Sequence, residues 1–518
     1  MHQKNYFNLM GNFLKLITIS FILLICTIFL YRTFLNISFS EASIEELSTI
    51  YKGIILNPFE LFLKMRSDSH PPLYYLTVNI FSKFLPKNVY GIRLISWFFY
   101  IASGILISIF TFLASKKFNP KNAIYSSTIS GLIFFINPLT VEYSSDGKMY
   151  TFLCFSISLT LFIRYFTLKV DKFKNLSNQY FIYSLSVCLL SLIHYFGVIY
   201  AFSLVFIDFV LERKKRLLKN QIFALIPVSI WIILFNFVGF IKNSNSKKTF
   251  LEFNFIGVIK QFFLGNNPLI FLTFILIVFL ISIYKKSFYK SSKFFEILNY
   301  SGIFATILTF LISIILSFKL SILHSRFFIY AVPSIAISQA LILSNIGRKK
   351  YIDFYSLAFT TFLVFQFWNH SFYNLNKYSL AGSKRASLYN SYSTYEKISL
   401  NTYKYKSRYT VFPVKHMIAT EFLMRKKNLI PENVKPFEPY YRIEDSIYGK
   451  SKNFTTRLRE TIYGAPKNLE NKFVVAVNKK KSKLEEFKKL KKDLFENDYI
   501  CTSLKDENEF AIYECNRN

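Results

Sequence analysis

Residues 68–75 read Asp-Ser-His-Pro-Pro-Leu-Tyr-Tyr, a polar, proline-stiffened stretch in a chain dominated by long apolar runs. Glu41 precedes this stretch and directly follows the first apolar run. Ionisable groups at the edge of a bilayer are costly unless they are paired or used. The region from Glu41 to Tyr75 therefore predicts a membrane-edge loop at which chemistry on a lipid-borne substrate can occur.

Composition places the chain among polytopic membrane proteins. Its 518 residues are 52% hydrophobic and 19% aromatic, and its mean hydropathy is +0.30. Apolar runs of about twenty residues, the length of a membrane-spanning helix, follow one another along the chain. The net charge of +34 lies largely in short loops between these runs, where Lys and Arg set membrane orientation. The basic charge therefore indicates topology rather than nucleic-acid binding.

The apolar runs predict about eleven membrane-spanning helices. Segment 72–86 is apolar but short and lies between prolines, so we expect an interfacial or re-entrant helix within a first exoplasmic loop, residues 32–93. With this count, most basic loops lie on the side of the N-terminus, which predicts a cytoplasmic N-terminus and an exoplasmic C-terminus. The predicted spans are 13–31, 94–115, 122–140, 149–168, 179–193, 198–212, 221–241, 268–284, 299–318, 326–346 and 351–369.

A change in composition divides the chain into a transmembrane domain, residues 1–369, and a polar C-terminal domain, residues 370–518. We expect the second region to be a small soluble α/β domain on the exoplasmic side of the membrane. Alternating and helical apolar patterns predict its elements. They are a strand at 473–477, a helix at 483–497, and strands at 499–503 and 509–514.

The cysteines follow this division. Cys501 and Cys515 lie opposite each other if the last two predicted strands form a hairpin around the polar turn 505–508. A disulfide between them can form if the domain is exoplasmic, because that compartment is oxidising. No Cys/His pattern of a zinc site occurs in the sequence. Three cysteines in apolar spans are interpreted as packing residues: Cys26, Cys154 and Cys188.

The predicted topology gathers polar residues on one exoplasmic face. Their convergence at a membrane edge is a hypothesis for a functional site. There are five clusters: Glu41, Asp68 with His70, residues 142–150, His194 with Tyr195, and His324 with Arg326.

Five motifs in chain order resemble those of the GT-C membrane glycosyltransferases. The similarity covers much of residues 13–346 and concerns the protein-mannosyltransferase-like and aminoarabinose-transferase-like members, of the glycosyltransferase family 39 type. Asp68 to Tyr75 and the His-Tyr-Phe-Gly motif at His194 to Gly197 are complete. The other three motifs differ from the family pattern or are short. Ser40-Glu41 stands where the family commonly has Asp-Glu, and in Tyr143 to Tyr150 the residues Asp146 and Lys148 replace a family Glu and Arg. The last motif is Ser325-Arg326-Phe327-Phe328, which precedes Pro333.

The resemblance implies an enzyme that moves a hexose or pentose from a polyprenyl-phosphate donor to an acceptor, with inversion at the anomeric carbon. Such a reaction needs a base for the acceptor's proton and cations for the donor phosphate. Glu41 or Asp68 is the expected base, since Ser40 stands where the family Asp usually carries that role. Lys148 and Arg326 are the expected phosphate ligands, although Lys lacks the bidentate fork of Arg.

Other residues complete the expected substrate site. His70 and His194 can hydrogen-bond a phosphate or polarise an acceptor, and Arg93 either joins the phosphate ligands or anchors its helix. No dedicated metal cage is visible in the sequence, although Glu41 and Asp68 together could hold one divalent cation. The remaining expected substrate-binding residues are Asp146, Tyr150 and Tyr195.

Structural interpretations stay open for several of these residues. Asp68 suits an N-terminal cap of the 72–86 helix. Asp146 can cap the following span while Lys148 extends to the membrane surface. His194 can be a polar residue at a kink, and Arg326 an interfacial anchor.

The expected partners are a polyprenyl-phosphate sugar, a lipid-linked glycan or protein acceptor, and membrane lipids, without nucleic acid. The expected location is the bacterial inner membrane, with the active site exoplasmic. The alternatives are a non-enzymatic transporter or flippase for lipid-linked glycans, an O-antigen-type polymerase or ligase, and an inactive scaffold. Few charges within the spans and no evident pair of broken half-helices disfavour the transporter.

Overall fold

The computed structural model describes residues 2–39, 44–65, 70–118, 120–169, 176–212, 215–233, 292–317, 325–346, 397, 409–412, 472–479, 499–508 and 510–517. The chain divides into two compact units. One comprises Met1–Ser40 with Lys52–Leu380, and the other Glu41–Tyr51 with Ala381–Asn518. The predicted spans 268–284 and 351–369 and the predicted helix 483–497 lie outside the described residues.

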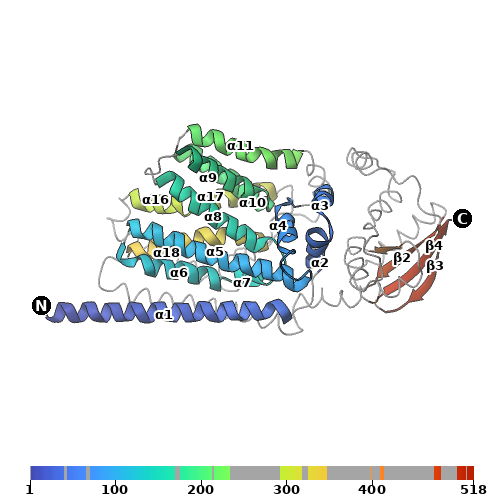
Figure 1. The fold of residues 1–518 in the computed structure, drawn as a ribbon, viewed down its shortest axis with the longest axis horizontal. Coiled ribbons are helices and arrows are strands. Elements are labelled where there is room, and N and C mark those ends of the chain that lie inside the picture. The colour runs from blue at the N-terminus through green and yellow to red at the C-terminus, as the bar shows by residue number, and fades with distance from the viewer. Residues whose placement is uncertain are drawn as a thin grey trace. The chain divides into compact units, whose positions relative to one another are not determined.

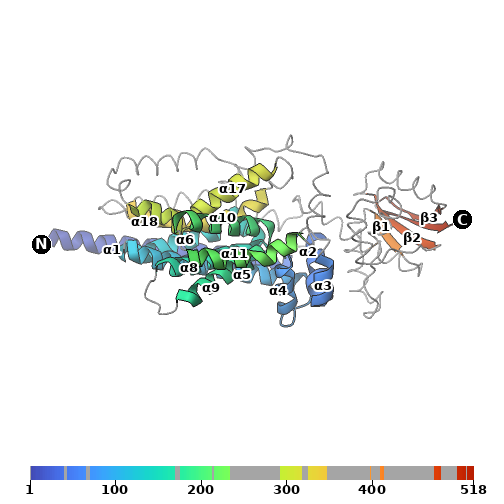
Figure 2. The same cartoon turned by 90° about the horizontal axis from the view of Figure 1, so that it is seen from above.

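The first unit is a bundle of α-helices, in which α1 runs along one side and α11 along the opposite side (Figure 1). A view from above shows α17 and α10 side by side (Figure 2), and these two helices pack together. The helices are α1 (His2–Phe39), α3 (Pro58–Met65), α4 (Leu73–Phe81), α5 (Val89–Phe118), α6 (Ala123–Ile136), α7 (Pro138–Ser144), α8 (Tyr150–Lys169), α9 (Leu176–Ser191), α10 (Tyr195–Leu211), α11 (Lys215–Trp231), α16 (Ser292–Tyr300), α17 (Ile303–Ser317) and α18 (Val332–Ile346). Shorter 3₁₀ and π turns are η1 (Tyr51–Ile55), η2 (Pro120–Asn122) and η5 (Ser325–Ala331).

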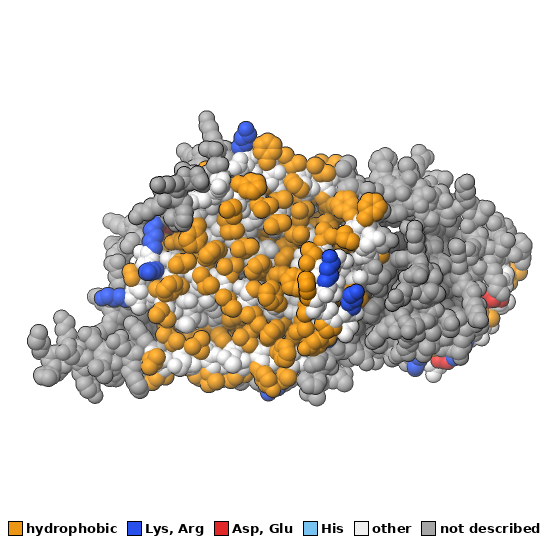
Figure 3. All heavy atoms as spheres, in the orientation of Figure 1, with side chains coloured by type: hydrophobic (Ala, Val, Ile, Leu, Met, Phe, Trp, Pro, Cys, Tyr) orange, Lys and Arg blue, Asp and Glu red, His pale blue; other side chains and the backbone are white. Residues whose placement is uncertain are grey.

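The bundle presents an apolar face of the kind that contacts lipid. Figure 3 shows hydrophobic side chains covering this face, with Lys and Arg at its margins. Three segments among the described helices are long and apolar enough to cross a membrane: Leu16–Ile37, Val89–Phe118 and Tyr150–Leu168. These confirm the spans predicted at 13–31, 94–115 and 149–168. The chain is therefore an integral membrane protein, and the full number of spans stays a prediction.

The predicted span 122–140 is not one straight helix. It is broken into α6 and α7, which meet at an angle of 62°. Pro138 begins α7 and cannot donate a backbone hydrogen bond, and Asn137 before it is extended and caps α7 with its side chain. The hydroxyl of Tyr100 donates to the carbonyl of Phe135 at 2.5 Å, which satisfies a group that the break would leave unpaired. After the bend, the chain continues through α7 to residues 145–149, which precede α8.

The short apolar segment after Pro71-Pro72 is confirmed as a short helix. α4 has nine residues, about 13 Å of helix, and cannot cross a bilayer. Within α4, Tyr74 and Tyr75 are buried and Ile80 is exposed, as is Phe84 just after the helix. This division gives α4 one face toward the protein and one apolar edge outside it, as expected for an interfacial helix.

The second unit contains α2 (Ile44–Ile50) and a four-stranded sheet of order β1-β2-β4-β3. β1 pairs with β2 in parallel, and the other two pairings are antiparallel. The strands are β1 (Tyr409–Phe412), β2 (Lys472–Asn478), β3 (Tyr499–Asp506) and β4 (Phe510–Arg517). The three predicted strands are confirmed and are longer than expected. Cys501 lies opposite Cys515 and forms the disulfide that the hairpin pattern allowed.

Candidate active site

Two histidines from distant parts of the sequence lie next to each other in the bundle. The ring centroids of His70 and His194 are 5.5 Å apart, and Tyr195 lies 6.5 Å from His70. The backbone N–H of Leu73 donates to the carbonyl of Leu192 at 3.1 Å, which ties the two loops together. The Pro-Pro loop and the His-Tyr-Phe-Gly motif therefore lie against each other in the fold.

His194 caps helix α10. It has an extended backbone, and its Nδ1 accepts a hydrogen bond from the backbone N–H of Phe196 at 3.1 Å. This contact places the proton of the neutral imidazole on Nε2. His194 is 2% exposed, so its donor faces a largely dehydrated environment. The residue is thus a buried helix cap whose Nδ1 is an acceptor.

The segment from Tyr143 to Tyr150 also reaches His194. The ring of Tyr150 lies 6.0 Å from His194 and 4.5 Å from Tyr143. The ammonium of Lys148 lies 5.9 Å from the centroid of the Tyr150 ring, at cation–π distance. Asp146 is buried, and its carbonyl accepts from the backbone N–H of Lys148 at 2.6 Å. This tight turn brings a cation to the aromatic and imidazole cluster.

The 3₁₀ turn η5 packs against α8 and α10, with contacts at Cys154 and Phe196 near the start of each helix. Tyr330 of η5 stacks on Phe196 with ring centroids 5.4 Å apart. Cys154 of α8 donates to the carbonyl of Ile329 at 3.5 Å. Arg326 belongs to this turn, but its side chain lies outside the described part of the structure.

Arg93 contacts another element. Its guanidinium is buried, and Nη1 donates to the carbonyl of Ile37 at 3.1 Å. Ile37 lies in the last turn of α1, where backbone carbonyls lack helical partners and attract cations. This contact supports the anchoring role for Arg93.

The two candidate bases, Glu41 and Asp68, lie outside the described residues. Their position relative to the histidines therefore stays a prediction. Among the residues that the structure describes, no group of three His, Cys, Asp or Glu side chains is placed to hold a metal ion.

The cluster has the chemistry of an anion site beside aromatic rings. Lys148 supplies a positive charge, and His194 supplies an oriented N–H. Hydrogen bonds from such groups to an anionic oxygen are shorter and stronger than those between neutral groups. Tyr150 and Tyr195 provide flat surfaces of the kind that pack against rings.

A buried ion pair that no sequence motif indicated lies elsewhere in the bundle. Arg164 of α8 and Asp208 of α10 are in contact at 2.7 Å, with side-chain exposures of 0% and 1%. An ionisable residue inside each of two predicted spans was the available signal.

Comparison with solved structures identifies the fold. The structure is similar to the crystal structure of ArnT from Cupriavidus metallidurans in the apo state, with a TM-score of 0.50 and 10% sequence identity over 96% of this chain and 98% of that chain. The chain thus has the fold of the GT-C membrane glycosyltransferases, as the motifs predicted.

Two further structures resemble the chain at lower TM-scores. ArnT from the same organism bound to undecaprenyl phosphate gives 0.48 at 11% identity, over 96% of this chain and 98% of that chain. The archaeal oligosaccharyltransferase AglB from Archaeoglobus fulgidus, in complex with an inhibitory peptide and a dolichol-phosphate, gives 0.45 at 11% identity, over 95% and 74%. No protein-family model matches the sequence, and no curated protein sequence does.

Proposed function

We propose that this protein is a glycosyltransferase that moves a sugar from a polyprenyl-phosphate donor to an acceptor on the exoplasmic face of the membrane. The observation that carries the proposal is the junction of His70, Tyr150 and His194 at one end of a bundle with the GT-C fold. ArnT, whose apo form shares this fold, has also been crystallised with undecaprenyl phosphate. A polyprenyl-phosphate donor is consistent with a cationic, partly aromatic site in a membrane protein.

The proposed reaction is a direct displacement. An acceptor hydroxyl or phosphate oxygen forms a bond to the anomeric carbon of the sugar, and the bond from that carbon to the donor phosphate oxygen breaks. The electron pair leaves with the polyprenyl phosphate, while Glu41 or Asp68 takes any proton of the acceptor. Attack opposite the leaving group inverts the anomeric configuration.

The described residues contribute to holding the leaving group. Lys148 offsets the charge that grows on the phosphate, and the Nε2–H of His194 donates to one of its oxygens. His70 lies close enough to serve the same phosphate or the acceptor. Arg326 is proposed as a second cation, on the basis that its turn η5 packs against the starts of α8 and α10.

The side of the membrane is part of the proposal. The disulfide between Cys501 and Cys515 favours an oxidising compartment for the C-terminal domain, residues 370–518. With a cytoplasmic N-terminus this corresponds to the exoplasmic face of a bacterial plasma membrane. The domain would then help to bind the acceptor, a lipid-linked glycan or a protein.

The test is transfer of radiolabel from a panel of polyprenyl-phosphate hexoses and pentoses in membranes that contain the wild type, Glu41→Gln or Asp68→Asn. We expect transfer by the wild type and its loss in one variant at an unchanged protein level. Glu296→Gln on α16 is the matched control, because it removes one carboxylate outside the proposed site. Absence of transfer from every donor, with binding or translocation of a lipid-linked glycan instead, would favour a transporter.

A further inference from the structure

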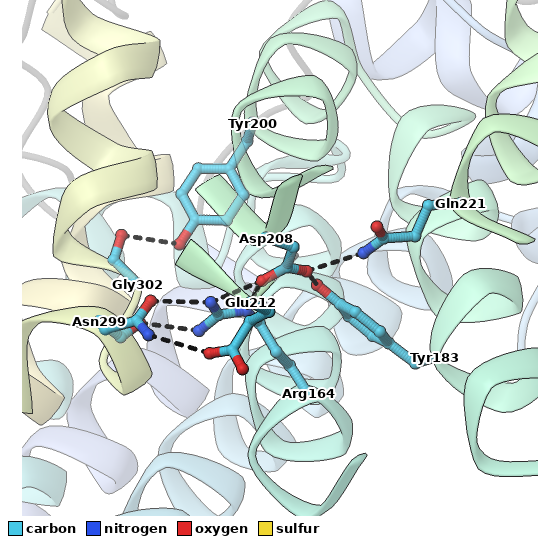
Figure 4. Close-up of polar contacts among 8 residues, drawn as sticks. All are labelled: Arg164, Tyr183, Tyr200, Asp208, Glu212, Gln221, Asn299 and Gly302. Atoms are coloured by element: carbon cyan, nitrogen blue, oxygen red, sulfur yellow. Dashed lines mark hydrogen bonds and ion pairs between the residues drawn. The ribbon is translucent and has the colours of Figure 1, made fainter. Parts of the chain in front are cut away.

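A second polar network lies inside the bundle (Figure 4). Arg164 donates from Nε and Nη2 to Oδ1 of Asp208 at 2.8 and 2.7 Å. The other carboxylate oxygen of Asp208 accepts from the hydroxyl of Tyr183 and from Nε2 of Gln221, both at 2.7 Å. All four residues are buried.

The network also holds the end of helix α16. Nη1 and Nη2 of Arg164 donate to the carbonyl and to Oδ1 of Asn299, both at 2.8 Å. Asn299 lies in the last turn of α16, where a cation is favourable because the carbonyls there lack helical partners. Five helices, α8, α9, α10, α11 and α16, thus contribute to one network whose carboxylate accepts four hydrogen bonds. A carboxylate whose acceptor sites are filled in this way is suited to hold the surrounding helices in place rather than to bind a ligand.

The ion pair lies at the same sequence spacing from the candidate site along both α8 and α10. Tyr150 is the first residue of α8 and His194 caps the start of α10, and their rings lie 6.0 Å apart. Arg164 follows Tyr150 by 14 residues, and Asp208 follows His194 by 14 residues. The two helices are therefore parallel, with one contact at their starts and one about 21 Å further along each of them.

We propose that Arg164 and Asp208 are positioning residues that set the axial register of α8 against α10 and so hold Tyr150 beside His194. A shift of one helix by one turn would move it by about 5.4 Å and separate both contacts. A buried ion pair contributes little net stability compared with well-packed apolar side chains, but in known cases buried polar groups fix register. The inference rests on the proposed function only in treating Tyr150 and His194 as part of an active site.

The rival explanation is that the pair only stabilises the bundle. The two explanations differ for the double variant Arg164→Met with Asp208→Leu, which replaces the ion pair by apolar side chains. The double variant removes the acceptor of the Tyr183 hydroxyl and of Gln221 Nε2, so a lower thermal midpoint is expected under both explanations. If the pair matters for stability alone, the folded double variant keeps the geometry of the site. If the pair sets register, the folded double variant no longer holds Tyr150 beside His194.

Cysteine cross-linking measures that geometry without any substrate. The parent for this experiment is the full-length protein with Cys26, Cys154 and Cys188 replaced by Ser and with Tyr150→Cys and His194→Cys introduced. A short bis-methanethiosulfonate joins the two new thiols, and mass spectrometry gives the fraction of cross-linked peptide. Ser203→Ala is the matched control, since it removes the acceptor of a buried hydrogen bond that the hydroxyl of Thr309 on α17 donates to α10, outside the network.

We expect efficient cross-linking in the parent and in the Ser203→Ala control. In the double variant we expect the yield to fall by about 2- to 30-fold, the range in which residues of a packed network change the coupling between two sites. The thermal midpoint should fall below that of the parent, so both proteins are cross-linked well below the midpoint of the double variant. An unchanged yield in the double variant, or no cross-link in the parent, would overturn the inference.

If the double variant does not accumulate in membranes, Asp208→Asn takes its place. It removes the charge but keeps the side-chain volume, so a smaller fall in yield is expected, and an unchanged yield contradicts the inference. The result is independent of the sugar-transfer assay. If the cross-linking results are as expected but the wild type transfers no sugar from any donor, the positioning role is retained and the proposed function is lost.

Discussion

The backbone N–H of Leu73 donates to the carbonyl oxygen of Leu192 across more than a hundred residues of sequence. This bond connects the loop that carries His70 to the loop that carries His194. Because it is a backbone contact, the proximity of the two imidazoles does not depend on the two side chains alone. Substitution of either histidine should therefore leave the other in place.

The two roles of His194 can be separated by substitution. His194→Asn retains a side-chain acceptor for the N-terminus of α10, whereas His194→Ala removes it. We expect His194→Ala to lower the free energy of unfolding by about 1 kcal/mol relative to His194→Asn, the usual contribution of a helix cap. Thermal unfolding of the two purified variants compares these values, and equal midpoints would contradict the capping role.

Both His194 variants should also lose catalytic efficiency. Each lacks the Nε2–H, and a hydrogen bond to a charged group contributes about 1.5–3 kcal/mol, which corresponds to about a 10- to 150-fold fall in kcat/KM. The measurement is sugar transfer at varied donor concentration. Wild-type kcat/KM in His194→Asn would exclude contact between this imidazole and the reacting groups.

Lys148 tests the proposed phosphate contact. Lys148→Met removes the charge but keeps an unbranched chain against Tyr150, so we expect a weaker donor interaction and a higher KM. Lys148→Arg restores a cation that can bind phosphate with two parallel hydrogen bonds. We expect this variant to recover donor binding, as measured by competition with unlabelled polyprenyl phosphate. Wild-type donor binding in Lys148→Met as well as in Lys148→Arg would exclude a role for the charge of Lys148.

The backbone conformation at position 302 requires glycine. Its φ is +77°, and an added Cβ would lie 2.6 Å from both Leu161 Cδ2 and the hydroxyl oxygen of Tyr200. Gly302→Ala should destabilise the protein by at least about 1–2 kcal/mol, the cost of a left-handed conformation for a residue with a side chain. This cost should appear as a lower thermal midpoint.

Gly131→Ala is the control for this substitution. Gly131 lies within α6, and its added Cβ would meet only side-chain atoms of Ser108, whose hydroxyl can rotate. We expect little change, or a small gain from the higher helix propensity of Ala. A loss of stability equal to that of Gly302→Ala would show that crowding rather than backbone conformation governs both positions.

The disulfide stabilises the C-terminal hairpin. Cys501 and Cys515 are 14 residues apart, and closing a loop of this length contributes about 3 kcal/mol in the chain-entropy treatment. Cys501→Ser with Cys515→Ser should lower the stability of the sheet by this order while leaving the helical bundle unaffected. Limited proteolysis followed by mass spectrometry distinguishes cleavage in the two units, and equal protection of the sheet in wild type and variant would contradict the prediction.

The sequence allowed prediction of those features that depend on local pattern. Long apolar runs predicted α1, α5 and α8, and alternation predicted β2, β3 and β4 together with the opposition of Cys501 and Cys515. The break at Asn137 was missed although Pro138 signals it, because average apolarity does not register a single missing N–H donor. The length of an apolar run therefore predicted where a span lies better than it predicted where the span bends.

The candidate site was only partly accessible from sequence. Family motifs brought His70, Tyr150 and His194 into one hypothesis, and the structure places their rings together. Arg164 and Asp208 were missed because no motif joins them and they are 44 residues apart. Only the tertiary arrangement shows that each of these charges has a partner.

The matched spacing in α8 and α10 restricts which changes of length these helices can accept. Deleting one residue between Tyr150 and Arg164 would rotate one end of α8 by about 100° and shift it by about 1.5 Å relative to the other end. One of the two contacts with α10 would then face away from its partner. Insertions and deletions in relatives of this protein should accordingly be excluded from both 14-residue intervals, or should occur in both at once.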